Sequence, residues 1–239
     1  MMQLIKDIYE RHAGVLGYRM IGGILRLQGI SISDNTVYSY MKQMNLQAII
    51  MRKKPDYIYG VKHQIYDNLL DQDFSASAPN QKWCTDFTYL KLSDGRKRYN
   101  CSIIDLYDRS VVATLNGKSI TAGLAADTVK IALKRTNTSG NLILHSDQGS
   151  QFASHEFATF CKSNDIVQSM SKAGCPYDNA PIERFYNTYK NELINQYSFK
   201  DDETLNRATE EFVYAWYNQC RPHTYNNGLT PNMIRQSNY

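Results

Sequence analysis

The chain has 239 residues, of which 42% are hydrophobic, so it can bury a core and is not an intrinsically disordered segment. A formal net charge of +4 permits a nucleic-acid partner without requiring one. The five cysteines contain no CxxC pair and the five histidines no HxxxH pair, which argues against a zinc site and a secreted disulfide scaffold. No stretch approaches the roughly 18 apolar residues of a membrane span, and no signal-peptide pattern is present, so we expect a cytoplasmic protein.

Residues 1–50 are predicted to form a small all-helical module. Apolar side chains recur at helical spacing over 18–25, and a turn at 29–31 precedes a further helix that Ser33 or Asn35 can cap. Two short helices around such a turn are typical of a helix-turn-helix. The pattern alone fits a plain helical hairpin equally well.

Residues 51–80 begin with a basic cluster and end in a stretch rich in serine, alanine and proline. This composition predicts a basic linker and a domain boundary. Lys53 and Lys54 in the cluster are candidate DNA contacts, and a solvated loop is the alternative interpretation.

Residues 81–200 are predicted to form the main α/β domain. Three consecutive strands are followed by alternating helices and strands, which indicates a mixed sheet. The expected strands are 83–92, 99–105, 110–115, 142–144 and 166–170, and the expected helices are 121–136, 155–164 and one that begins near Pro181 with Asn179 as its cap. Residues 201–239 should add a helix starting at Asp201 or Asp202 and a tail, both packed on this core.

Three carboxylates occupy positions that matter in such a fold. Asp86 lies within an apolar strand, Asp147 directly follows the buried strand 142–144, and Glu183 lies in the first turns of the helix after Pro181. Each has an ordinary structural explanation: Asp86 as a buried hydrogen-bonding group, Asp147 as a helix cap and Glu183 as a partner of the helix dipole.

Together, the three carboxylates suggest a metal site. If strand 142–144 pairs with the strand of Asp86, then Asp86 and Asp147 emerge side by side, and a helix crossing that edge brings Glu183 to them. Carboxylates about 4 Å apart repel by roughly 4 kcal/mol per pair, so protons or a multivalent cation must offset the repulsion. An all-oxygen site selects Mg²⁺ or Mn²⁺, and a pair of such ions is the usual clamp for displacement at phosphate.

Lys190 follows Glu183 by seven residues, which places both on one helix face. A cation beside the metal site can contact a DNA phosphate or a base edge near the scissile bond. The alternative is a surface lysine that pairs with Tyr186 or with solvent.

These residues fall in linked motifs through which the chain resembles the OrfB-type insertion-sequence transposases, a family with the retroviral-integrase (DDE) catalytic core. Thirty-five residues separate Asp147 from Glu183, which is the interval characteristic of the family. The matching segments are Trp83–Tyr89, Ile104–Arg109, His145–Phe152, Gly174–Phe185, Lys190–Leu193, Tyr217–His223 and Thr230–Pro231. The N-terminal residues 17–46 are similar to the helix-turn-helix of the family.

The resemblance implies a ribonuclease-H-like fold, a mixed five-stranded sheet flanked by helices, with Asp86, Asp147 and Glu183 as ligands of Mg²⁺ or Mn²⁺ in a site for two ions. It implies Lys190 as the contact to the element's end. Arg184 departs from the family, which often has a small polar residue there. The remaining candidates for DNA contacts or supporting roles are His145, Asn179, Arg184, Arg221, Lys53 and Lys54.

The expected function is DNA cleavage and strand transfer at the terminal inverted repeats of the chain's own insertion sequence, with joining to target DNA. The expected partners are other copies of the chain on DNA and an upstream-frame OrfA-type protein or fusion, in a bacterial, nucleoid-associated setting. Two alternatives stay open: a non-catalytic helix-turn-helix regulator, and a general nuclease of the same fold. The sequence does not specify the DNA ends, the target preference or the oligomeric state.

Overall fold

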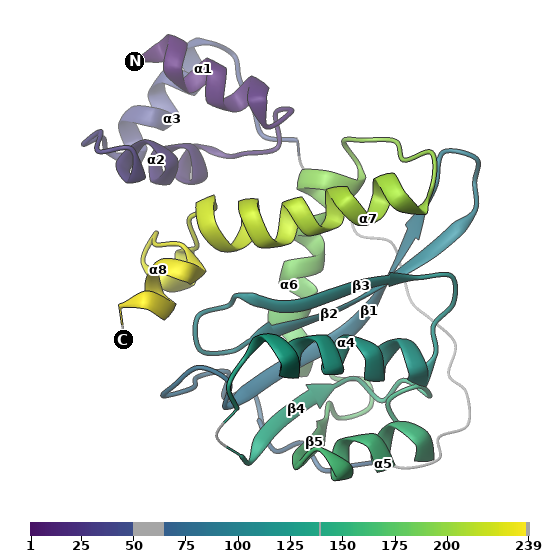
Figure 1. Cartoon of the computed structure of the whole chain (residues 1–239). Helices are drawn as coiled ribbons and strands as arrows, with labels where there is room; N and C mark the ends of the chain where they lie inside the picture. Colours follow the sequence, from purple (N-terminus) through teal and green to yellow (C-terminus); the bar gives the residue numbers. More distant parts are fainter. Residues whose placement is uncertain (50–64, 139, 238–239) are drawn as a thin grey trace.

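A computed structural model of the chain describes residues 1–49, 65–138 and 140–237, so the predicted DNA contacts Lys53 and Lys54 lie outside the described residues. Figure 1 shows a small helical module above a larger α/β domain. In the described parts of the chain, no helix is long and apolar enough to cross a membrane.

The N-terminal module contains three helices, α1 (Met2–Arg11), α2 (Tyr18–Leu27) and α3 (Asp34–Gln43). Their apolar faces enclose a separate small core that includes Ile5, Ile21, Leu25 and Val37. Ser33, one of the two predicted caps, accepts a hydrogen bond from the main-chain N–H of Thr36. Gly29 has a φ of +82° in the connecting turn, a conformation that costs glycine little. The predicted helix-turn-helix arrangement is therefore present.

A mixed five-stranded sheet forms the centre of the larger domain, as predicted. Its strand order is β3-β2-β1-β4-β5. The two pairings among β1, β2 and β3 are antiparallel, whereas β4 runs parallel to both β1 and β5. The strands are β1 (Lys82–Lys91), β2 (Lys97–Asp105), β3 (Val111–Gly117), β4 (Leu142–Ser146) and β5 (Ile166–Met170).

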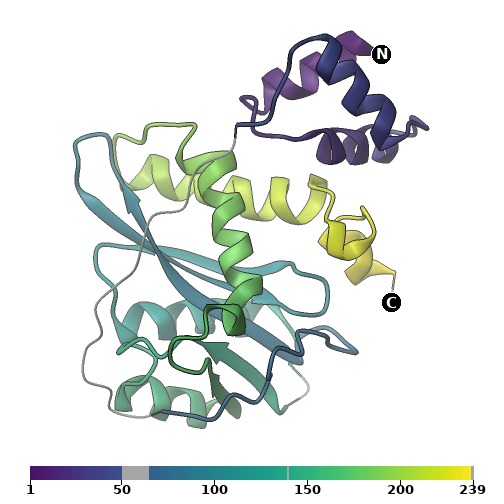
Figure 2. The ribbon, with the colours of Figure 1, turned by 180° about the vertical axis from the view of Figure 1, so that it is seen from behind.

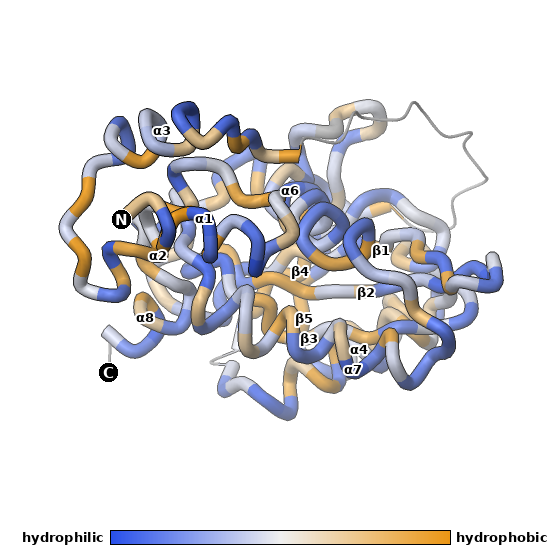
Figure 3. Tube along the Cα trace, turned by 90° about the horizontal axis from the view of Figure 1, so that it is seen from above, coloured by the Kyte–Doolittle hydropathy of each residue, from blue (hydrophilic) through white to orange (hydrophobic). Residues whose placement is uncertain are grey.

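Each face of the sheet is covered by its own set of helices (Figures 1 and 2). Trp83 and Phe87 of β1 pack in one core with α4 (Ala122–Arg135) and α5 (His155–Ser163). The alternate residues Cys84 and Leu90 pack in a second core with α6 (Ala180–Tyr189), α7 (Asp202–Glu210) and the π-helix η3 (Glu211–Cys220). Because side chains alternate along a strand, Asp86 lies on the α6 face. Figure 3 shows hydrophobic segments along the central strands.

The helical segments around α6 differ from the predicted pattern in two ways. A 3-10 helix, η1 (Pro176–Asn179), precedes α6, and a π-helical segment, η2 (Lys190–Ile194), follows it. Asn179 occupies the N-cap position of α6, as predicted, but its side chain makes no capping hydrogen bond. By contrast, Asp201 caps α7 through a reciprocal pair of hydrogen bonds with Thr204.

A buried ion-pair network holds the C-terminal segment against the sheet. This segment contains the 3-10 helix η4 (Thr224–Asn226) and α8 (Pro231–Gln236). The guanidinium of Arg235 in α8 lies 2.5 Å from an Asp105 carboxylate oxygen and 2.6 Å from one of Asp108. Both aspartates are fully buried, so this tail is part of the folded core.

Candidate active site

Asp86 lies within β1 and Asp147 directly follows the adjacent parallel strand β4, at matching positions along the two segments. The last residue pair between β1 and β4 is Cys84 with His145, and each aspartate follows its paired residue by two positions. β4 is a short, largely buried strand that pairs in parallel with β1, as is usual for strands that lie inside a sheet covered on both faces. The predicted neighbourhood of the two carboxylates is therefore confirmed.

Helix α6 carries the third carboxylate across the same face of the sheet (Figure 2). Ile182 and Phe185 are buried in the core beneath it, which leaves Glu183 half-buried at the first turn of the helix. Pro181 occupies this first turn, where its missing N–H breaks no helical hydrogen bond.

The electrostatics of Asp86 reflect all three acids. Burial raises the pKa of Asp86 well above its usual value, and the Asp147 carboxylate raises it further. A hydrogen bond from the Phe87 N–H opposes this increase, at 2.7 Å from Oδ1 of Asp86. Glu183 adds to the increase in pKa, whereas Lys190 lowers it. An ionised Asp86 is thus costly unless positive charge is brought to it.

The loop after β4 holds Asp147 by its own main chain. The N–H of Gly149 donates to Oδ1 of Asp147 at 2.8 Å. A Cβ atom on Gly149 would lie 2.8 Å from the same oxygen and 2.2 Å from Nε2 of Gln151. Since real Cβ contacts are longer, the loop admits only glycine at this position without rearrangement.

The donor set fits a hard divalent cation. The three acids supply only carboxylate oxygens, and their mutual repulsion raises the proton affinity of Asp86. No group of three or more His, Cys, Asp or Glu side chains within the described ranges is close enough to hold a metal ion as it stands. The carboxylates are therefore near enough for their charges to interact, without forming a closed coordination cage.

Lys190 lies at the end of α6, near the acidic residues. Burial lowers the pKa of its ammonium group, and the charge of Asp86 opposes that decrease. The seven-residue spacing from Glu183 runs through regular α-helix up to Tyr189, which keeps the two side chains on one face. The structure thus brings Lys190 to the site as the spacing predicts.

The other predicted DNA contacts have diverse surroundings. Arg184 is exposed on α6. Asn179 is buried, and among the described residues neither of its side-chain amide atoms has a hydrogen-bond partner. Arg221 forms an ion pair with Glu192 at 2.8 Å, and only 15% of its side chain is exposed. This ion pair gives Arg221 a structural role in the fold, and its predicted contact with DNA stays a prediction.

Besides the three carboxylates and Lys190, two buried residues support the site, namely His145 and Tyr186. His145 is fully buried, its Nδ1 lies 2.8 Å from the Ser169 hydroxyl, and burial lowers its pKa to about 4. Tyr186, one turn after Glu183, donates its hydroxyl hydrogen to the carbonyl oxygen of Asp86. The motif around His145 indicated a supporting role, but Tyr186 gave no sequence signal beyond its helical spacing.

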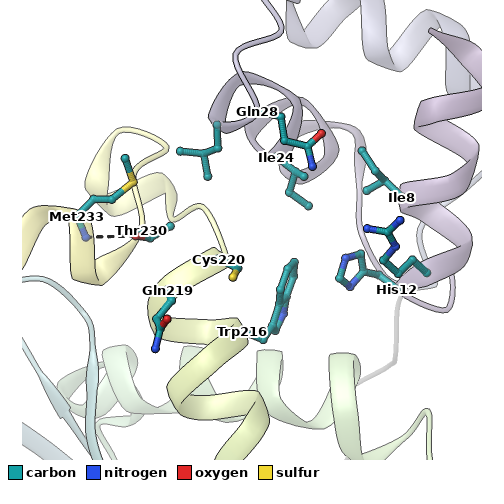
Figure 4. Close-up of a pocket in the computed structure, with 11 residues that line it drawn as sticks. Ile8, His12, Ile24, Gln28, Trp216, Gln219, Cys220, Thr230 and Met233 are labelled. Carbon is teal, nitrogen blue, oxygen red and sulfur yellow. Dashed lines mark hydrogen bonds between the residues drawn. The ribbon is translucent and has the colours of Figure 1, made fainter.

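A pocket of about 520 Å³ lies away from these acids, between the N-terminal module and the C-terminal helices (Figure 4). His12, which directly follows α1, and Trp216 of η3 face each other in it. Further lining residues include Ile8, Ile24, Cys220 and Met233.

Comparison with known families matches most of the chain to two kinds of domain. Residues 76–176 and 164–231 each match an integrase core domain, and residues 1–54 match an HTH-like domain. The chain is 35% identical over 215 residues to the transposase InsF for insertion sequence IS3A of Escherichia coli (strain K12). That alignment covers 90% of this chain and 74% of the relative.

Solved structures show the same fold. The HTLV-2 integrase catalytic core domain, in a structure with magnesium, is 24% identical with a TM-score of 0.53, covering 67% of this chain and 99% of that domain. The second structure is a simian T-cell lymphotropic virus intasome in complex with the PP2A regulatory subunit B56 gamma. Its matching chain is 17% identical with a TM-score of 0.53, and the match covers 97% of this chain and 74% of that one. The larger domain therefore has the predicted ribonuclease-H-like, integrase-type fold.

Proposed function

The chain belongs to the IS3-type family of insertion-sequence transposases, and we propose that it cuts and joins DNA at the ends of its element through Asp86, Asp147 and Glu183. The observation that carries this assignment is the matched position of Asp86 on β1 and Asp147 directly after β4, with Glu183 on the helix that crosses these strands. No observation favours the alternative of a non-catalytic regulator.

The three carboxylates would hold one or two divalent cations, with Mg²⁺ or Mn²⁺ as the ions of choice for oxygen ligands. When bound, such ions activate an attacking oxygen and stabilise a leaving oxygen at phosphate. The magnesium in the HTLV-2 integrase structure supports this choice by analogy. The chain itself orients the ligands, through the Phe87 N–H on Asp86 and the Gly149 N–H on Asp147.

Lys190 and Arg184 are the proposed DNA contacts beside the acids. The ammonium group of Lys190 is close enough to Asp86 for their charges to interact, and Arg184 is exposed one residue after Glu183. Positive side chains at these places would neutralise phosphates next to the scissile bond. Asn179 and the linker residues Lys53 and Lys54 complete the proposed set, and the HTH-like module supports binding of the terminal inverted repeats.

The proposed assembly contains several copies of the chain on paired element ends and target DNA. The HTLV-2 core domain is described in a trimeric form, which supports multimer formation by analogy. An OrfA-type protein from an upstream frame and action on the bacterial nucleoid belong to the same proposal, and the InsF relative is a bacterial transposase. Copurification of the chain with an upstream-frame product tests this part.

The decisive experiment incubates the protein with labelled DNA carrying the element's ends and Mg²⁺, and compares Asp147→Asn with the unchanged chain. We expect strand cleavage and transfer by the unchanged chain, a loss of at least about 100-fold in the variant, and no reaction with EDTA. Asp127→Asn on α4, where Asp127 pairs with Lys130 at the surface, is the matched control and should keep full activity. Equal rates for Asp147→Asn and Asp127→Asn would exclude Asp147 as a metal ligand.

A further inference from the structure

Tyr186 lies on α6 between the two proposed functional residues of that helix. It follows Glu183 by three positions and precedes Lys190 by four, so all three share one helix face. The residue is 5% exposed, and its ring packs against that of Phe185 with centroids 5.2 Å apart. The side chain therefore points into the layer between α6 and the sheet.

The hydroxyl of Tyr186 makes hydrogen bonds with both strands below the helix. It donates to the carbonyl oxygen of Asp86 on β1 and accepts from the N–H of Ser102 on β2 at 2.9 Å. Asp86 and Ser102 are paired residues in the antiparallel ladder. One hydroxyl thus joins the helix of Glu183 to the strand of Asp86 at the level of Asp86 itself.

This contact restricts both the rotation and the sliding of α6 over the sheet. Apolar packing by Ile182 and Phe185 holds the helix down, but such packing tolerates small shifts, whereas a buried hydrogen bond has a narrow range of lengths and angles. The hydroxyl of Tyr186 therefore fixes the position of α6 on the two strands more narrowly than the apolar contacts do.

We propose that Tyr186 is a positioning residue that sets the placement of Glu183 and Lys190 relative to Asp86 through its hydroxyl bridge to β1 and β2. This inference rests on the proposed function, because it assumes that the acids bind a cation. Tyr186 itself touches neither the metal nor the DNA in this role.

The test compares Tyr186→Phe with Tyr189→Phe. Each variant loses one buried hydroxyl from α6 and retains its ring, so each should fold. The Tyr189 hydroxyl bonds to the Thr209 hydroxyl at 2.8 Å and has no contact with Asp86 or Ser102 among the described interactions. Both variants should lower Tm, Tyr186→Phe by more because its hydroxyl makes two hydrogen bonds to buried main-chain groups, and only Tyr186→Phe should disturb the acids.

Two measurements separate the variants. Mn²⁺ binding, followed by the electron paramagnetic resonance signal of the free ion, should weaken about tenfold in Tyr186→Phe and change less than about twofold in Tyr189→Phe. The Mg²⁺ concentration for half-maximal cleavage should rise by a similar factor in Tyr186→Phe alone.

The outcomes distinguish a failure of this inference from a failure of the proposed function. If the unchanged chain binds no Mn²⁺ and cuts no DNA, the proposed function fails and the role of Tyr186 fails with it. If the unchanged chain binds and cuts, but both variants have its metal affinity, then the function stands and the positioning role of Tyr186 is overturned.

Discussion

The imidazole of His12 stacks on the indole of Trp216, with ring centroids 4.2 Å apart and planes inclined by 27° (Figure 4). On its other side, Trp216 donates its Nε1 hydrogen to Glu192 at 2.9 Å, and Glu192 also pairs with Arg221. Glu192 belongs to η2, which begins at Lys190. The N-terminal module is therefore connected, through one ring pair, to the helical segment that carries a proposed DNA contact.

The His12 stack should loosen in acid. Burial is the main cause of the lowered pKa of His12; Arg11 lowers it further, whereas Glu192 opposes the shift. Because docking lowers the pKa of His12, the neutral imidazole stabilises the docked N-terminal module at pH values above the ordinary pKa of about 6.5. This stabilisation is lost as pH falls below that value. We expect the hydrogen-exchange protection factors of residues 1–49, which correct for the intrinsic pH dependence of exchange, to fall between pH 7 and pH 5.5, and His12→Ala to remove most of that decrease.

His155→Ala is the control for this prediction, because His155 is exposed at the start of α5 and far along the chain from the junction. Its pH profile should match that of the unchanged chain. A His12→Ala profile as steep as the unchanged one would show that the junction does not respond to this histidine.

Gly149 should be essential for the geometry of Asp147. In Gly149→Ala, the new methyl group meets Oδ1 of Asp147 at 2.8 Å and must displace it or the Gln151 side chain. We expect cleavage of element-end DNA to fall at least about tenfold with little change in Tm, since the loop is local and half-exposed.

Gly123→Ala in α4 is the matched control, because its Cβ would lie 3.8 Å from the nearest side-chain atom, Oγ1 of Thr121. It should keep full activity and gain about 0.5–1 kcal/mol of stability from its helix position. Full activity in both variants would mean that the loop adjusts without moving Asp147.

Local sequence patterns predicted the elements that position the acids. The five strands were predicted with bounds within two residues of those observed, because aromatic and β-branched runs between turn residues are distinctive. The adjacency of Asp86 and Asp147 was expected on the condition that strand 142–144 pairs with the strand of Asp86, and the observed pairing of β4 with β1 meets that condition. The metal ligation itself stays a prediction.

Long-range partners were not predictable from local patterns. Arg221 looks like a free cation in the sequence, and only the fold brings Glu192 to it from 29 residues away. The helix after Asp201 was expected to be continuous, yet it changes to π-helix at Glu211, and a periodicity of 3.6 gives no warning of such a change. The Tyr186 bridge likewise depends on how α6 crosses two strands.

Arg235→Met should destabilise the fold in a pH-dependent manner. It leaves the buried carboxylates of Asp105 and Asp108 without their cation, which costs about 3–5 kcal/mol when both are ionised. Burial and Asp108 already raise the pKa of Asp105 to about 6, and loss of Arg235 removes the main opposing charge. Because the pKa of Asp105 is raised, the destabilisation caused by Arg235→Met is present above that pKa and decreases as pH falls. The loss of unfolding free energy, measured by urea unfolding, should therefore be smaller at pH 5 than at pH 8.

The control for Arg235 is Arg207→Met, which removes an exposed arginine from α7 and should cost less than about 0.5 kcal/mol at either pH. A loss for Arg235→Met that is equal at pH 5 and pH 8 would argue against the role of Asp105 in the network.

His145 should make the fold acid-sensitive. Burial lowers its pKa to about 4, against an ordinary value of about 6.5, whereas interactions with Asp178 partly oppose the shift. The unfolded chain therefore binds a proton between these values when the folded chain does not, and stability falls by a few kcal/mol as pH drops from 6.5 to 4. His145→Gln, which can still bond Ser169, should have a shallower slope of unfolding free energy against pH in this window.

His223, whose burial lowers its pKa to about 3, acts in the same direction, so the slope should decrease without vanishing. An unchanged slope in His145→Gln would show that His145 is already protonated in the folded chain above pH 4.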